Sequence, residues 1–575
     1  MIAPRNVSTL SIADRIALLK IDSPPVNALS HAVRVAIHDG LRAALADPEV
    51  DAVVLCCGGR MFFAGADISE LSRPLLPPLL GDIIALMEAA AKPVVAAMHG
   101  AALGGGLELS LACNYRAAVP SASFGLPEVA LGLLPAAGGT QRLPRLTGVA
   151  AATQMMVSGR PVDAETALRL GLIDTIVAEG ALEAGAMAFA RDLVARKAPQ
   201  RRVRDLPTDL DVEAAAAIFA AFRREHPALF TGFKAPTAIL EAVDAAVRLP
   251  FEDGLAREKA LSRDLNAGSE SKALRHLFAA ERTAVKVPDL APDVKPRPVT
   301  TVRVKGTTEV ATALAGLFTA SGFHVTVDGP GNGTAPAADL VIDATGAPPS
   351  DDPEGAATDA VLVVTTPLLD SQSLSGRRVA LQIALVNGQV ALLEIGRGVE
   401  TDEVAVASLL AVARRLRVPV VVERPVRGYV LARLKKAGEE AAARLSLTGI
   451  AEDTIRTALA ECGIAPCGPG AIADAAAGEV AVPAEVARSI LYSLVDEAAL
   501  LVEDQTALRA SDIDLLAVKA LGWPAWRGGP LFWGRHIGYR HIADHLAATA
   551  GERDTMRRPS PALRNLAAQE KEVTL

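Results

Sequence analysis

The chain has 575 residues, of which 50% are apolar and 22% are charged, as is ordinary for globular proteins. At the usual size of a domain, this length predicts about three to five domains. The net charge of −8 arises from 58 basic and 66 acidic residues. Because nucleic-acid binders normally carry a basic excess, we expect no nucleic-acid partner.

The ends of the chain and its cysteines indicate a cytoplasmic protein. No apolar run reaches the roughly 18 residues that a membrane-spanning helix needs, and residues 1–22 lack the order of a signal peptide. Five cysteines in so long a chain do not form a disulfide framework. Cys462 and Cys467 have no second Cys or His pair nearby, so we expect no metal site.

Residues 1–190 alternate short β-rich runs with helical or Gly/Ala-rich stretches. The runs at 15–22, 51–57 and 92–100 predict strands, and residues 27–47 predict an amphipathic helix with Ser30 as its N-cap. This alternation is typical of an α/β fold.

The residues in this region that best suit catalysis lie in three segments, 61–70, 99–118 and 124–146. Gly104, Gly105 and Gly106 open a helical stretch, and free amides at a helix N-terminus can hold a developing oxyanion. Glu108 and Glu128 are the only acids in the last two segments, among apolar neighbours that favour a raised pKa and general acid–base work. Taken singly, the glycine turn is more often plain packing, and Glu108 is as often a capping or paired residue; together the segments are far more specific.

These segments resemble the crotonase (enoyl-CoA hydratase/isomerase) superfamily, through GADISE (65–70), GGGLEL (104–109), PEVALGLLP (127–135) and GGTQRL (138–143). The resemblance implies a ββα-spiral domain whose oxyanion amides are those of Ala66 and Gly105. It implies that Glu108 and Glu128, 20 residues apart, are the acid–base carboxylates. The implied substrate is an acyl-CoA, with coenzyme A carried by the substrate and no further cofactor for hydration.

Retention of both glutamates favours a hydratase, since a double-bond isomerase of this family needs chiefly the Glu128 equivalent. The family commonly has Gly where this chain has Ala136, and we expect the Ala136 amide to help hold the water. Isomerisation, retro-aldol cleavage or thioester hydrolysis of a specialised acyl-CoA remains an alternative, as does an acyl-CoA-binding scaffold of a degradative complex. Basic residues that are candidates for the CoA phosphates are Arg275, Arg282 and Lys286.

Residues 191–295 carry little strand signal and predict helices at 236–249 and 254–286, followed by a Pro-rich linker at 287–299. A βαβ start follows at 299–328, then apolar runs typical of a buried parallel sheet. From about 425 onward the chain is helical, and residues 431–463 and 487–522 are weakly alike, as in a duplicated unit.

The order of these regions resembles the type 1 multifunctional β-oxidation enzyme, in which a crotonase domain precedes a 3-hydroxyacyl-CoA dehydrogenase. The predicted fold class is therefore α/β: a crotonase domain, a helical linker completing it, a degenerate Rossmann-like parallel-sheet domain and two C-terminal helical units. In that order, the predicted ranges are 1–190, 191–295, 296–424, 425–480 and 481–575. The linker predicts an intramolecular cover and a monomer.

The dinucleotide fingerprint G-x-G-x-x-G is incomplete in the second half. Only Gly306 fits, because the second and third glycine positions hold Thr308 and Ala311. Glu309 adds negative charge where a pyrophosphate would lie, although Asp328 would suit ribose hydroxyls. We therefore expect NAD binding to be lost.

The dehydrogenase residues implied by the resemblance are also replaced. The family's His stands twelve residues before a Glu, which aligns with Glu394, and that His position is Gln382, whose amide cannot act as a base. The family's later Asn is Ala432. No histidine stands between His324 and His536, so only a relocated base such as His324 would preserve the activity. We expect an inactive module that completes the fold, covers the hydratase site, or binds an acyl-CoA or a partner without chemistry.

Overall fold

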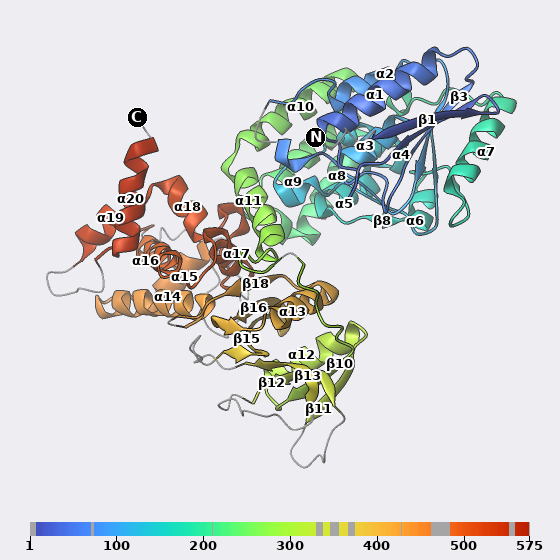
Figure 1. The fold of residues 1–575 in the computed structure, drawn as a ribbon. Helices are drawn as coiled ribbons and strands as arrows, with labels where there is room; N and C mark the ends of the chain where they lie inside the picture. Colours follow the sequence, from blue (N-terminus) through green and yellow to red (C-terminus); the bar gives the residue numbers. More distant parts are fainter. Residues whose placement is uncertain are drawn as a thin grey trace. The chain divides into compact units, whose positions relative to one another are not determined.

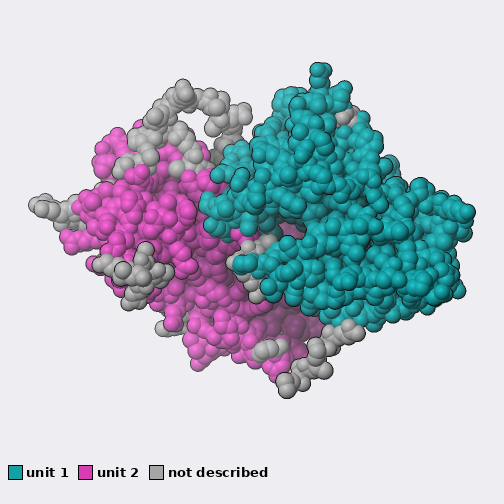
Figure 2. Space-filling model, turned by 90° about the horizontal axis from the view of Figure 1, so that it is seen from above, with its two compact units in different colours: residues 1–272 teal, residues 273–575 magenta. Residues whose placement is uncertain are grey.

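The computed structural model describes residues 7–70, 74–209, 211–291, 293–328, 337–345, 356–365, 374–426, 428–461, 484–550 and 558–573. The chain forms two compact units, residues 1–272 and residues 273–575 (Figures 1 and 2). The five ranges predicted from the sequence stay predictions, and one of them, 191–295, crosses the boundary between the two units. Cys462 and Cys467 lie outside the described residues.

The first unit is built on a six-stranded sheet in the order β1-β2-β3-β4-β6-β9, which is parallel except for the β1–β2 pair. Every residue of β3 and β4 is buried, as their continuous apolar runs predict for strands covered on both faces. The strands are β1 (Ser8–Ala13), β2 (Ile16–Ile21), β3 (Ala52–Cys57), β4 (Val94–Met98), β6 (Tyr115–Ala118) and β9 (Thr175–Ile176).

A smaller sheet in the same unit has the order β5-β7-β8, with strands β5 (Ala101–Leu103), β7 (Ser123–Gly125) and β8 (Val162–Asp163). Strands β5 and β7 are parallel and in register, Leu103 beside Gly125. Because parallel strands end at the same edge of a sheet, the segments that follow them begin side by side. Those segments are helix α3 and the 3₁₀ helix η2, which carry Glu108 and Glu128.

Helix α4 packs against α3, α5, α9 and α10, all within the first unit. Glu270, at the start of α11, accepts from the Lys234 and Ala235 amides at the N-terminus of α9. The helices are α1 (His31–Ala46), η1 (Ile68–Glu70), α2 (Leu80–Glu88), α3 (Gly105–Ala112), η2 (Pro127–Leu131), α4 (Gly139–Thr147), α5 (Val149–Ser158), α6 (Ala164–Arg169), α7 (Leu182–Ala195), η3 (Val203–Asp205), α8 (Val212–Glu225), η4 (Pro227–Leu229), α9 (Ala235–Arg248), α10 (Phe251–Ala267) and α11 (Ser269–Ala284), which runs across the unit boundary.

The second unit contains a seven-stranded sheet in the order β11-β10-β12-β13-β15-β16-β18. It opens with the predicted βαβ arrangement, but β15 and β16 pair antiparallel, unlike the parallel pairing expected of them. The turn between them, Asn387-Gly388, has positive φ at both residues and is too short for a parallel crossover. The strands are β10 (Thr301–Lys305), β11 (His324–Asp328), β12 (Ala338–Asp343), β13 (Ala356–Val364), β15 (Arg378–Val386), β16 (Gln389–Gly396) and β18 (Val420–Glu423), with a separate pair β14 (Ser375–Gly376) and β17 (Glu400–Thr401).

Helices dominate the C-terminal part of the second unit, where α14 and α16 pack together around a core that includes Leu434, Ile490 and Trp523. The α/β class with a helical C-terminal part is thus confirmed. No helix among the described residues is long and apolar enough to cross a bilayer. The helices are α12 (Glu309–Ala320), α13 (Glu403–Leu416), α14 (Val430–Leu447), α15 (Glu452–Glu461), α16 (Ala484–Glu503), α17 (Ala510–Ala520), η6 (Ala525–Arg527), α18 (Pro530–Ile537), α19 (Tyr539–Thr549) and α20 (Pro561–Val573).

Candidate active site

The two amides expected to form an oxyanion hole lie close together. Gly65 has φ +101°, and a Cβ added there would lie 3.7 Å from the Gly105 nitrogen. A Cβ added to Gly105 would lie 3.6 Å from the Ala66 nitrogen. The loop of Gly65 is held by the Leu29 amide, which donates to the Gly65 carbonyl at 2.9 Å. The structure therefore brings the Ala66 and Gly105 backbones to one place, at the N-terminus of α3.

Glu128 lies over the glycine turn that precedes α3. Gly104 has φ +52°, and a Cβ there would lie 2.8 Å from Glu128 Oε1. Glu128 is partly buried as a residue, but its Oε2 is shielded from solvent and has no hydrogen-bond partner among the described residues. One carboxyl group is thus placed beside the turn that carries the candidate oxyanion amides.

Glu108 is held by the loop that leads into α4. It is 4% exposed, and its Oε1 accepts from the Ala137 amide at 2.7 Å and the Gly139 amide at 2.8 Å. Ala136, the predicted water-holding position, is exposed and immediately precedes these two donors. Its role with water stays a prediction.

Burial raises the pKa of both carboxyl groups. For Glu108 the amides of Ala137 and Gly139 and the charge of Arg142 oppose that effect. The pKa of Glu128 lies well above its usual range, because of burial and then the nearby Glu108 charge. Carboxyl groups that hold or exchange a proton near neutral pH suit general acid–base catalysis.

A third buried glutamate, Glu258 of α10, belongs to the same cluster and was not anticipated from the sequence. It is 0% exposed, and burial followed by the Glu108 charge raises its pKa to about 8. A signal was available: Glu258 shares the apolar face of its helix with Gly254, Leu261 and Leu265, which are all buried.

Comparison with known proteins bears on this same region. Residues 11–231 match the enoyl-CoA hydratase/isomerase family. After this similarity, the matched residues are called the hydratase/isomerase domain. A solved structure of an enoyl-CoA hydratase from Mycobacterium avium subsp. paratuberculosis covers 48% of this chain and 99% of its own, at 24% identity and a TM-score of 0.35.

Longer proteins match the chain beyond that domain. The peroxisomal bifunctional enzyme of Danio rerio is 45% identical over 275 residues, which are 47% of this chain and 37% of that protein. The corresponding enzyme of Cavia porcellus is 39% identical over 327 residues, 55% of this chain and 44% of that protein. The matches therefore cover less than half the length of these relatives.

Outside the hydratase/isomerase domain, the dinucleotide fingerprint positions are occupied by the chain's own contacts. The Thr308 hydroxyl caps α12: it accepts from the Ala311 amide at 3.1 Å and lies 3.2 Å from the Ala344 carbonyl, to which it donates. Gly306 has φ +112°, and a Cβ there would lie 2.8 Å from that carbonyl. Asp328, the candidate for ribose hydroxyls, is paired with Arg303 at 2.8 Å.

Gln382 and Glu394 are cross-strand partners on β15 and β16, where the resemblance implies a His–Glu pair. The Glu394 carboxyl group lies next to that of Glu423 of β18, where a hydrogen bond forms if one of the two is protonated, and both groups are fully buried. Glu394 accepts from the Leu431 amide at 3.0 Å, and Glu423 accepts from the Val430 amide at 3.1 Å. Burial raises the pKa of both carboxyl groups, which favours a proton on the pair. Glu423 is a second residue that sequence reasoning missed.

The remaining candidates lie in the second unit. Arg282 stacks its guanidinium 4.3 Å from the centre of the Phe278 ring, and the Lys286 carbonyl accepts from Arg509. Burial lowers the pKa of Arg275. Ala432 lies in the first turn of α14 and offers no polar group where the resemblance implies an Asn. Contact of these three basic residues with CoA phosphates stays a prediction.

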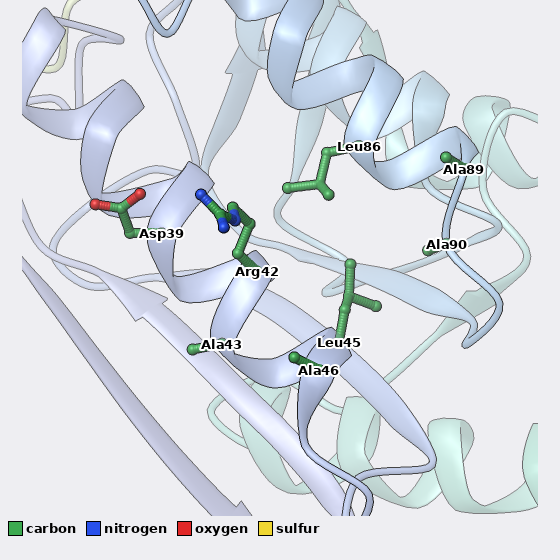
Figure 3. Close-up of a pocket in the computed structure, with 8 residues that line it drawn as sticks. All are labelled: Asp39, Arg42, Ala43, Leu45, Ala46, Leu86, Ala89 and Ala90. Atoms are coloured by element: carbon green, nitrogen blue, oxygen red, sulfur yellow. The ribbon is translucent and has the colours of Figure 1, made fainter.

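A hollow of about 660 Å³ lies on the hydratase/isomerase domain, away from the candidate active site. It is lined by residues of α1 and α2, among them Arg42, Leu45 and Leu86 (Figure 3). Neither Glu108 nor Glu128 lines it, so this hollow is distinct from the candidate active site.

Proposed function

We propose that the chain is an enoyl-CoA hydratase, which adds water across a trans-2-enoyl-CoA to give a 3-hydroxyacyl-CoA. The observation that carries this proposal is the joint placement of Glu108, Glu128 and two backbone amides. Glu128 lies against Gly104 while Glu108 is tied to the loop before α4. The amides of Ala66 and Gly105 stand at the intervening helix N-terminus.

In this mechanism the Ala66 and Gly105 amides bind the thioester oxygen and stabilise the negative charge that develops there. The two glutamates hold one water, remove a proton from it and deliver a proton to the α carbon of the substrate. Burial raises the pKa of both carboxyl groups, which suits them to exchange protons with the water and the substrate. Coenzyme A enters as part of the substrate, and no other cofactor takes part.

The dehydrogenase reaction is proposed to be absent. Thr308 uses the Ala311 amide that a pyrophosphate would need, and Glu309 follows it at the start of α12. Gln382 supplies no base beside Glu394. NAD binding is accordingly proposed to be lost.

The test is hydration of crotonyl-CoA by the full chain, monitored through the loss of enoyl absorbance. Glu128→Gln removes the proton-carrying group beside the oxyanion turn, so we expect kcat to fall by about 10²–10⁴-fold. The matched control is Glu165→Gln, since Glu165 is exposed on α6 of the same unit. Full activity of the Glu128→Gln protein would overturn the assignment. An inactive wild type would redirect the search to specialised acyl-CoA substrates or to acyl-CoA binding without chemistry.

Isomerisation of enoyl-CoA is a second proposed activity, because only Glu128 lies directly against the oxyanion turn while Glu108 Oε1 is tied to two amides. Glu108→Gln separates the two reactions. Hydration is expected to be lost, whereas isomerisation of a 3-enoyl-CoA to a 2-enoyl-CoA is expected to persist. Equal loss of both would assign isomerisation to the pair of glutamates.

The setting of the reaction is proposed from the sequence alone: a cytoplasmic monomer acting on acyl-CoA without a nucleic-acid partner. The relatives named above are described as peroxisomal. Cell fractionation and light scattering test location and oligomeric state directly.

A further inference from the structure

Four consecutive backbone amides at the start of α4 are divided between two buried carboxyl groups. The Ala137 and Gly139 amides donate to Glu108, at 2.7 and 2.8 Å. The Gly138 amide donates to Glu258 Oε1 at 2.8 Å, and the Thr140 amide donates to Glu258 Oε2 at 3.1 Å. The two glutamates, from α3 and α10, therefore accept hydrogen bonds from alternate residues of one short segment, residues 137–140, called the strip.

Glu258 holds its side of the strip through a further bond. The Thr140 hydroxyl donates to Glu258 Oε2 at 2.5 Å, so both of its carboxyl oxygens are engaged. The first amides of a helix have no partner within the helix, and a carboxyl group there also meets the favourable end of the helix dipole. Removal of a buried acceptor would leave the Gly138 and Thr140 amides unsatisfied, which costs stability locally.

Helix α10 is seated closely on α4. A Cβ at Gly254 would lie 2.2 Å from Gln141 Oε1, so glycine at this position lets the Gln141 side chain of α4 approach α10 closely. At the start of α10, the Phe251 ring is surrounded by three guanidinium groups, with centroid distances of 4.7 to 5.3 Å; they belong to Arg142, Arg145 and Arg204. These contacts hold Glu258 at a fixed height along α4.

We infer that Glu258 is a positioning residue of the hydration site, which orients Glu108 by holding the strip 137–140. The inference rests on the proposed hydratase function. Glu258 acts through the backbone, because it bonds the two amides that alternate with those on Glu108. The strip cannot shift toward or away from Glu108 without loosening its bonds to Glu258.

The test compares Glu258→Gln with Asp264→Asn, a carboxyl-to-amide change at an exposed position of the same helix. A Gln side chain has one acceptor and one donor group, so it cannot accept from the strip through both ends. We expect Glu258→Gln to lower kcat for crotonyl-CoA hydration by about 10–100-fold, within the range of a displaced general acid or base, with KM changed less than threefold. Glu258→Asp should retain more activity than Glu258→Gln, and Asp264→Asn should match the wild type.

The pH profile gives a readout that general loss of structure would not produce. The Ala137 and Gly139 amides lower the pKa of Glu108, so a loosened strip should raise it. The acidic limb of kcat/KM should therefore move to higher pH in Glu258→Gln. The charged or titratable groups that act on this cluster are Arg142, Glu128 and the two glutamates themselves. Arg142 and Glu128 are unchanged in Glu258→Gln, and loss of the Glu258 charge would lower the pKa of Glu108, so a rise can come only from loosened amide bonds.

Each outcome has a defined meaning. A wild type inactive on enoyl-CoA would overturn the proposed function itself. An active wild type whose Glu258→Gln variant has the kcat and pH profile of Asp264→Asn would overturn the positioning role alone. If Glu258→Gln does not fold, Thr140→Ala takes its place, since it deletes one donor to Glu258 and leaves both amides. A kcat loss of about threefold is then expected, and an unchanged kcat would overturn the inference.

Discussion

The cluster of Glu108, Glu128 and Glu258 in the first unit and the pair Glu394 and Glu423 in the second are both buried carboxyl groups, and they differ in what their polar atoms contact. In the first unit, Glu108 bonds backbone amides while Glu128 keeps one oxygen without a partner among the described residues. In the second, Glu394 and Glu423 lie next to each other, and each accepts from an amide at the start of α14. Burial raises the pKa in both clusters.

A raised pKa therefore does not by itself distinguish a reactive site from a structural one. The discriminating feature is the adjacent backbone. Gly104 and Gly105 present bare backbone beside Glu128, whereas the Thr308 side chain already uses the helix N-terminus that a dinucleotide would approach. The comparison yields four predictions.

The largest effect is expected from Gly104→Ala, which tests whether the bare turn is needed. Its Cβ would lie 2.8 Å from Glu128 Oε1, so the carboxyl group must move, and we expect kcat for hydration to fall by about 100-fold. Gly180→Ala is the control, because Gly180 also has positive φ, at +75°, but nothing lies within 4 Å of its added Cβ. If both variants lose activity equally, backbone strain rather than contact with Glu128 would account for the loss.

Glu423→Gln tests whether the second cluster is structural. Its folded pKa is raised above the usual 4.5, so the folded state binds the extra proton, and stability falls as pH rises above that value. A Gln amide can donate to Glu394 at any pH. Urea unfolding, with hydrogen exchange of α14 as the local probe, should show a weaker loss of stability between pH 5 and 8 than the wild type. Exposed Glu400→Gln is the control, and an unchanged pH dependence would contradict the shared proton.

Thr308→Ala tests the occupied helix terminus. Loss of this N-cap should lower the free energy of unfolding of the second unit by about 1 kcal/mol. Thr312→Ala, which removes an exposed hydroxyl one turn later, should change it by no more than about 0.5 kcal/mol. Calorimetry of both variants measures the difference, and a neutral Thr308→Ala would mean that the cap bond is immaterial.

The smallest effect is expected from Gln382→His. It restores the residue type that the resemblance implies beside Glu394, but it leaves Thr308 and Glu309 in place. We expect no NADH from 3-hydroxybutyryl-CoA and NAD in either the wild type or this variant. NADH formation by the wild type would refute the loss of dehydrogenase function, and formation by the variant alone would show that the cofactor site is intact.

Motifs made the first cluster predictable in part. Glu108, Glu128 and the glycine turn lie within contiguous segments whose spacing carries information. The parallel strands β5 and β7, which were not predicted, bring these segments together. Glu258 and Glu423 could not be found in this way. Glu258 is one of several acids in α10, and Glu423 ends an apolar strand. Neither belongs to a motif, and Glu258 bonds Thr140, which lies 118 residues away.

The sheet of the second unit was predictable to the same degree. Its apolar runs gave the strands, but run-by-run hydrophobicity does not specify strand direction. The antiparallel β15–β16 pair depends on the local chemistry of Asn387 and Gly388, which a survey of buried runs overlooks.

The alternating hydrogen bonds to residues 137–140 also set a minimum length for a fragment that keeps the proposed hydratase site intact. A polypeptide ending at residue 231, where the family match stops, would keep Glu108 and Glu128 but leave the Gly138 and Thr140 amides without Glu258. Extension to residue 272 would restore Glu258 and also Glu270, which caps α9. If the proposed hydratase function holds, the segment between the two ends supports the candidate active site, and truncation experiments should retain it.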